Sequence, residues 1–144
     1  MLSGMVSCYD PRDPHSRPVS PRSGREALAE ASLLLDSGHA NTGVNRLYYA
    51  CFYAVSALLL TKGLTATSHS GLRRLFHQHL IRPGLLPLGH GPLYDRWFDQ
   101  RQRSDYVDLV YFGVDEVRAW SVDAQAFVDA VAVLIQQALA APLP

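Results

Sequence analysis

The chain has 144 residues, a length that suits one domain large enough to bury its own hydrophobic core. Its residues are 48% hydrophobic and 18% charged, as in ordinary globular proteins, and the formal net charge of zero argues against blanket attraction to nucleic acid. Residues 1–18 lack the apolar core of a signal peptide, and polar residues interrupt the apolar run over residues 44–62. We therefore expect a cytoplasmic protein that does not span a membrane.

The N-terminal segment, residues 1–22, is predicted to be a disordered tail because it cannot bury enough apolar surface to order itself. Its prolines are Pro11, Pro14, Pro18 and Pro21. The folded domain is expected over residues 23–140. Ser23, followed three residues later by Glu26, predicts a capping box at the start of the first helix, and Gly38 predicts the end of that helix.

The clearest element is the helix expected within NTGVNRLYYACFYAVSALLLTKG, residues 41–63. Its apolar side chains form two stripes at helical spacing, so the helix should lie at the centre of a bundle or be shared with a partner chain. Gly63 is placed to end it. Cys51 lies inside the apolar pattern and Cys8 in the tail, which favours a buried, reduced thiol at Cys51 over a disulfide.

The remaining elements are also predicted to be helical. A third helix is expected from Ser68 or Ser70 to about residue 80, and residues 82–92 should form a loop. The fourth helix should run to about Phe112 and end at Gly113, and the fifth should begin near Asp115. The predicted fold class is all-α: an up-and-down bundle of four long helices plus a short one.

Basic residues gather in the middle of the chain. No acidic residue lies between Asp36 and Asp95, whereas five basic residues and five of the six histidines do. This asymmetry can mark an anion-binding face, although a solvated surface balanced by acids elsewhere in the fold is the alternative. The five basic residues are Arg46, Lys62, Arg73, Arg74 and Arg82.

Two further patterns invite functional readings, and we favour a structural one for both. His77 and His79 are two residues apart, so on a helix they point in different directions and would need ligands from other elements to hold a metal. We therefore predict no metal site and no cofactor. The tyrosines of residues 41–63 could stack nucleic-acid bases, but at this spacing they favour the core or a dimer interface.

Arg101 and Asp105 lie one helical turn apart, flanked at helical spacing by Tyr94, Phe98 and Phe112. A core-facing stripe would normally be apolar at both positions. One interpretation is a structural ion pair that braces the bundle, because an unpaired buried charge would cost several kcal/mol. The other is that Arg101 faces a cleft or a two-fold interface and offers its guanidinium to a phosphate.

Three motifs in order, NRLYYACFYA, TSHSGLRRLF and RQRSDY, followed by AQAFVDAVAVLI, resemble the HEPN domain superfamily, specifically its small single-domain bacterial and archaeal branch. The likeness covers residues 25–138. It implies a helical-bundle homodimer. Catalytic members of the superfamily cleave RNA without metal, using an arginine and a histidine four to six residues later, and are often toxins partnered by a small nucleotidyltransferase.

Arg101 matches the motif arginine, but residues 102–108 contain no histidine, and Val107 stands where some relatives have one. RNA cleavage needs a group that removes the 2′-hydroxyl proton and one that protonates the leaving oxygen. Asp105, His69 or Tyr106 could serve, although nothing in the sequence places His69 beside Arg101. Tyr106 also matches the tyrosine near this motif that is nucleotidylated in some HEPN toxins.

The leading hypothesis is a HEPN protein of a toxin–antitoxin-like or defence pair that binds RNA or nucleotide in a dimer cleft, with possible metal-independent ribonuclease activity. The alternative is a non-catalytic HEPN module that binds or regulates a nucleotidyltransferase, and a third hypothesis is a helical scaffold subunit. The candidate residues are Arg101, Asp105 and Tyr106 for catalysis, Arg101, Arg46, His69 and Arg103 for RNA or nucleotide binding, and Tyr49, Phe52 and Tyr53 for a dimer interface.

Overall fold

The computed structural model describes residues 22–105 and 111–141, apart from the side chains of Ser104 and Asp105. Within this part every regular element is a helix, which confirms the predicted all-α class. The predicted tail, residues 1–22, lies outside the described residues except for Arg22. The elements are α1 (Ser23–Asp36), α2 (Ala40–Thr61), α3 (His69–Phe76), the π-helical continuation η1 (His77–Ile81), α4 (His90–Asp105) and α5 (Val114–Ala140).

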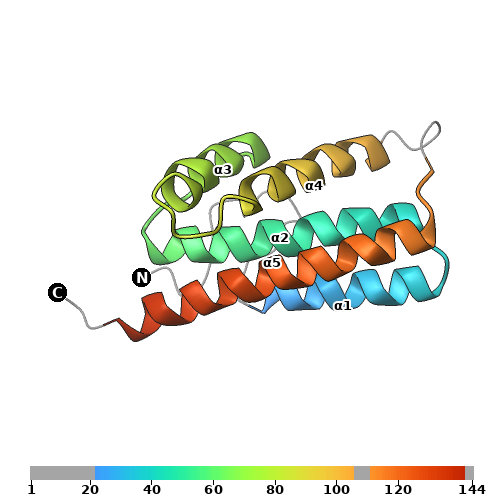
Figure 1. Ribbon diagram of the computed structural model, residues 1–144, viewed down its shortest axis with the longest axis horizontal. Coiled ribbons are helices and arrows are strands. Elements are labelled where there is room, and N and C mark those ends of the chain that lie inside the picture. The colour runs from blue at the N-terminus through green and yellow to red at the C-terminus, as the bar shows by residue number, and fades with distance from the viewer. Residues whose placement is uncertain (1–21, 106–110, 142–144) are drawn as a thin grey trace.

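Helix α2 lies at the centre of the bundle, as its two apolar stripes predict. It packs against α1 and α5 on one side and against α3 and α4 on the other (Figure 1). Most of its residues are buried, including Tyr48, Cys51 and Leu59. Cys51 is a free, fully buried cysteine, as predicted, and burial raises the pKa of its thiol.

Two predicted helix ends are confirmed by their local chemistry. At the end of α2, Gly63 takes a φ of +72°, and the N–H of Leu64 donates to the carbonyl of Leu59 at 3.0 Å. At the start of α3, the Ser68 hydroxyl accepts a hydrogen bond from the N–H of Gly71 at 2.9 Å. These two caps fix the connection that brings the first turn of α3 back onto α2.

The start of α1 differs from the predicted capping box. Arg22 occupies the cap position without a side-chain cap hydrogen bond, and Ser23 is already helical and buried. The reason is the close packing of α1 on α2, because a Cβ placed on Gly24 would lie 3.0 Å from the carbonyl oxygen of Ala50. Ser23 is therefore drawn into the helix interface rather than left at the cap.

Helix α4 is described as far as Asp105, and the predicted end at about Phe112 follows residues 106–110, which lie outside the described residues. Phe112 itself lies outside any helix. The N–H of Phe112 donates to Oδ1 of Asn41 at 3.0 Å, so this residue is tied to the first turn of α2 instead of continuing α4. The rings of Trp97 and Phe112 both pack edge-on against Trp120, which joins α4 and this connection to α5.

Helix α5 is long and apolar enough to cross a membrane by length and composition, whereas the sequence led us to expect no apolar run of that length. In the fold its buried side chains, among them Val117, Phe127 and Val131, pack into the core against α1 and α2. Figure 1 shows α5 lying alongside α2 over most of its length. Its apolar stripe is that of a core helix in a bundle.

Candidate functional site

Tyr48, in the middle of α2, is the centre of an aromatic cluster that we define as Tyr48, Tyr49, Phe52, Tyr94 and Phe98. The Tyr48 ring is fully buried, and its centroid lies between 5.3 and 6.1 Å from those of the other four rings. Helix α2 supplies three of the rings and α4 the other two. The cluster therefore fills the contact between these helices, in the part of α4 that precedes the RQRSDY motif.

Arg101 reaches into this cluster from α4. Its Cζ lies 5.3 Å from the centroid of Tyr48 and 5.8 Å from that of Tyr49, and the residue is half-buried. Aromatic faces carry partial negative charge, so a guanidinium can lie against them at a position where an aliphatic core would exclude it. This contact explains why a charged residue stands in the apolar stripe of α4.

Arg46 approaches the same cluster from α2. Its Cζ lies 4.9 Å from the centroid of Tyr49, the ring that Arg101 also contacts. One guanidinium nitrogen of Arg46 donates to Oδ1 of Asn45 at 2.9 Å, and another lies 3.7 Å from the Glu30 carboxylate. Two guanidinium groups from different helices therefore converge on one tyrosine ring.

His69 meets the cluster from the first turn of α3. Its Nδ1 and the Tyr48 hydroxyl are hydrogen-bonded at 2.7 Å, and its ring stacks on Phe52 with centroids 4.6 Å apart. Burial raises the pKa of Tyr48 well above its ordinary value of 10.0, so the hydroxyl stays protonated at neutral pH. His69 and Arg101 thus lie against the same two rings, Tyr48 and Tyr49, although the sequence alone does not bring them together.

The remaining predicted residues lie at the edge of this site or outside the described part. Arg103 is exposed near the end of α4. The side chain of Asp105 is not described and Tyr106 lies outside the described residues, so the Arg101–Asp105 pair stays a prediction. Of the predicted interface residues, Tyr49 and Tyr53 are half-buried, whereas Phe52 is 3% exposed and leaves almost no surface for a partner.

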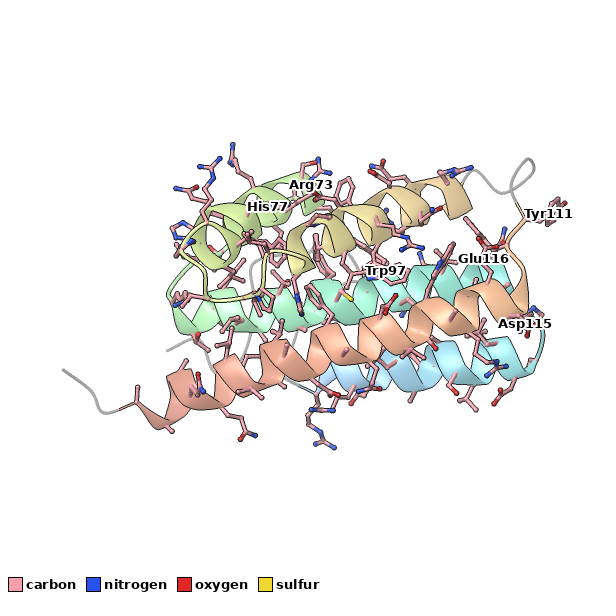
Figure 2. All side chains as sticks on the ribbon, in the orientation of Figure 1. Arg73, His77, Trp97, Tyr111, Asp115 and Glu116 are labelled. Carbon is pink, nitrogen blue, oxygen red and sulfur yellow. The ribbon has the colours of Figure 1, made fainter. Side chains whose placement is uncertain are left out.

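Arg73, one of the five basic residues of the acid-free stretch but not one of the predicted site residues, also lies at this site. From α3, its Cζ lies 4.2 Å from the centroid of Phe98, inside the aromatic cluster. It follows His69 by four residues and precedes His77 by four, so all three share one side of the α3–η1 arm. Figure 2 shows Arg73 and His77 on this arm, next to α4. The four-residue spacing of these side chains is visible in the sequence, but it does not reveal which aromatic rings Arg73 contacts.

Asp95 of α4 is the acidic neighbour of this arm. Its Oδ1 lies 2.9 Å from Nε2 of His77 and 3.9 Å from the guanidinium of Arg73. The shorter contact shows that the carboxylate pairs mainly with the histidine. In the described residues, no three side chains of the His, Cys, Asp and Glu types are grouped as metal ligands. The groups that this site presents to a ligand are therefore guanidinium groups, imidazoles and aromatic rings.

Known proteins are similar to this chain over most of its length. The HEPN domain family matches residues 21–135. A UPF0332 protein of Thermotoga maritima is 42% identical over 115 residues, covering 80% of this chain and 87% of the relative. A protein of Methanocaldococcus jannaschii with the name "Putative toxin MJ0605" is 27% identical over 114 residues, covering 79% of this chain and 84% of the relative.

Proposed function

The chain belongs to the HEPN domain family, and from this premise we propose that it is the HEPN component of a toxin–antitoxin-like or defence pair that binds RNA or nucleotide phosphate at Arg101. The observation that carries the proposal is the convergence of Arg46 and Arg101 on the ring of Tyr49. The toxin names of two archaeal relatives support the biological setting.

The physical reason is that aromatic rings hold a guanidinium without neutralising it. Stacking on Tyr49 uses the flat face of each group and holds two positive charges beside one ring, and the planar guanidinium is the side chain that best matches phosphate oxygens. Because Arg46 and Arg101 are half-buried, their attraction for an anion is less screened than that of charges in open water. His69 would add a further hydrogen-bonding group at the same rings.

We place this site in a cleft between two copies of the chain in the cytoplasm. The half-buried tyrosines Tyr49 and Tyr53 lie on the side of α2 that Arg46 also occupies, and they are the residues we expect at the dimer interface. No cofactor is part of the proposal. Arg103, exposed two residues beyond Arg101, would contribute a more distant contact to the ligand.

Cleavage of bound RNA is a separate question, because residues 102–108 contain no histidine. If the chain cleaves RNA, the 2′-oxygen attacks phosphorus and the 5′-oxygen leaves, so one group must take a proton and another must donate one. The candidates are His69, Asp105 and Tyr106, with Arg101 stabilising the charge on phosphate. The alternative function, a non-catalytic module that regulates a nucleotidyltransferase partner, is favoured by the missing motif histidine.

The test is ligand binding and RNA integrity with matched arginine variants. Arg101→Ala should weaken binding of a fluorescent mononucleotide by about tenfold, the effect of losing one charge-assisted contact. Arg25→Ala is the control, because Arg25 pairs with Asp129 on the exposed α1–α5 side of the bundle and its loss removes the same charge. Equal binding by wild type and Arg101→Ala would remove Arg101 from the site.

The same variants distinguish a ligand-binding role of Arg101 from a structural role in stabilising the bundle. If Arg101 mainly braces the bundle, Arg101→Ala should lower the melting temperature by many degrees while RNA integrity in cells and in vitro stays unchanged. If Arg101 is a ligand contact, the melting temperature should change little. RNA degradation by wild type in the presence of EDTA, absent in Arg101→Ala, would add metal-independent cleavage to the function.

A further inference from the structure

We propose that Arg73 forms a second phosphate subsite beside Arg101, and that the ligand is therefore a single-stranded oligonucleotide that spans both subsites rather than one nucleotide. This inference rests on the proposed function, because it extends the same site along α3. The supporting observation is that Arg73 and Arg101, from two different helices, each lie against an aromatic ring, and these two rings are in contact.

The two arginines are joined by a short run of aromatic contacts. Arg101 lies over Tyr48, the Tyr48 and Phe98 centroids are 6.0 Å apart, and Arg73 lies over Phe98 at 4.2 Å. Two cationic groups are thus held against two adjoining rings. A single phosphate can use one such fork, whereas successive phosphates of a strand can use both.

Arg73 is also accessible enough to contact a phosphate. Its side chain is 36% exposed, so part of it faces solvent while Phe98 supports its flat face. Asp95 is its acidic neighbour, but that carboxylate lies 1.0 Å closer to His77 than to Arg73, by the difference of 2.9 and 3.9 Å. Asp95 would repel a phosphate, but its hydrogen bond to His77 keeps it at the longer distance from Arg73.

The strand, rather than a nucleoside triphosphate, is favoured by the aromatic surface between the arginines. Tyr49 is half-buried and in contact with both Arg46 and Arg101, so the exposed part of this residue can contact a base next to a bound phosphate. A triphosphate carries its charges on one short chain and presents one base. A strand alternates phosphates and bases, which match the alternating arginines and aromatic rings of this surface.

The experiment measures how affinity depends on ligand length, using the full chain and fluorescence anisotropy. The ligands are a mononucleotide, ATP and unstructured RNA oligomers of increasing length. Arg73→Ala should weaken binding of the longer oligomers by about tenfold and leave mononucleotide binding unchanged. It should also reduce the slope of log K against log salt for the oligomers by about one.

Arg74→Ala is the matched control, because Arg74 is the exposed neighbour on the same helix and its replacement removes the same charge. Arg73→Gln, which keeps a long polar side chain over Phe98, repeats the test if Arg73→Ala unfolds. Asp95→Asn removes the nearby negative charge and should strengthen oligomer binding.

Three results would overturn the inference: equal weakening by the Arg73 and Arg74 variants, an Arg73 effect on the mononucleotide, or ATP binding as tight and as dependent on Arg73 as the oligomers. Failure of the proposed function gives a different result, because Arg101→Ala would then bind the mononucleotide as tightly as wild type. An Arg101 effect without an Arg73 effect leaves the proposed function standing and refutes the second subsite.

Discussion

Replacing Tyr48 with phenylalanine removes one hydroxyl from the centre of the site and leaves the ring that supports Arg101. That hydroxyl is buried, hydrogen-bonded to Nδ1 of His69 at 2.7 Å, and protonated at neutral pH because burial raises the pKa of Tyr48. A buried neutral hydrogen bond contributes about 1 kcal/mol to stability. Tyr48→Phe should therefore lower the free energy of unfolding by about 1 kcal/mol, or the melting temperature by about 3–4 °C for a domain of this size.

The measurement is urea unfolding at neutral pH, with Tyr53→Phe as the matched control. Tyr53 is half-buried on the same helix, so removal of its hydroxyl should cost less than about 0.5 kcal/mol. A double-mutant cycle with His69→Ala isolates the pair, and the loss from Tyr48→Phe should shrink when His69 is already absent. If both tyrosine variants unfold alike and the cycle shows no coupling, the Tyr48–His69 bond does not hold α3 onto α2, and the reasoning is wrong.

Three other predictions concern packing, pH and thiol chemistry. Gly24→Ala should destabilise the chain by about 1–3 kcal/mol in urea unfolding, because the new Cβ would press on the Ala50 carbonyl 3.0 Å away; wild-type stability would show that α1 can shift. Burial lowers the pKa of His90 from its ordinary value of 6.5, so its contribution to stability should be complete above pH 6.5 and lost as pH falls through the folded-state pKa. His90→Gln should flatten that decline in unfolding curves measured across pH. Cys51, in a Cys8→Ser background, should resist a thiol reagent until the chain unfolds, and fast native labelling would contradict its burial.

Features set by neighbouring residues could be predicted from the sequence. Gly63 ends α2 because a positive φ suits glycine, and Ser68 caps α3 because its hydroxyl reaches an N–H three residues on. The central place of α2 followed from its two apolar stripes. Each of these depends on contacts within about one or two helical turns.

Features set by distant residues could not be predicted. The Tyr48–His69 bond joins residues 21 apart in sequence, and its geometry depends on how residues 62–68 turn the chain between α2 and α3. Phe112 is tied to α2 by a bond to Asn41, 71 residues away. Arg73 has helical spacing from His69, but only the packing of α3 on α4 shows that it meets Phe98.

Four arginines of the described residues are held in two different ways, and the difference supports the proposal of an anion site in a protein of zero net charge. On the α1–α5 side, Arg25 and Arg118 each pair with a carboxylate at 3.1 Å, which neutralises their charge locally. At the aromatic cluster, Arg46 and Arg73 stack on rings while their nearest described carboxylates lie at 3.7 and 3.9 Å.

A ring attracts a cation without cancelling its charge, so the aromatic contacts offset less of the positive charge of these arginines than close ion pairs would. The acid-free stretch between Asp36 and Asp95 supplies the sequence basis for this arrangement, since it leaves α2 and α3 without carboxylates of their own. Arg101 enters the same cluster from α4. An arginine in the apolar stripe of α4 is therefore compatible with folding because its neighbours are aromatic, and it is suited to binding phosphate for the same reason.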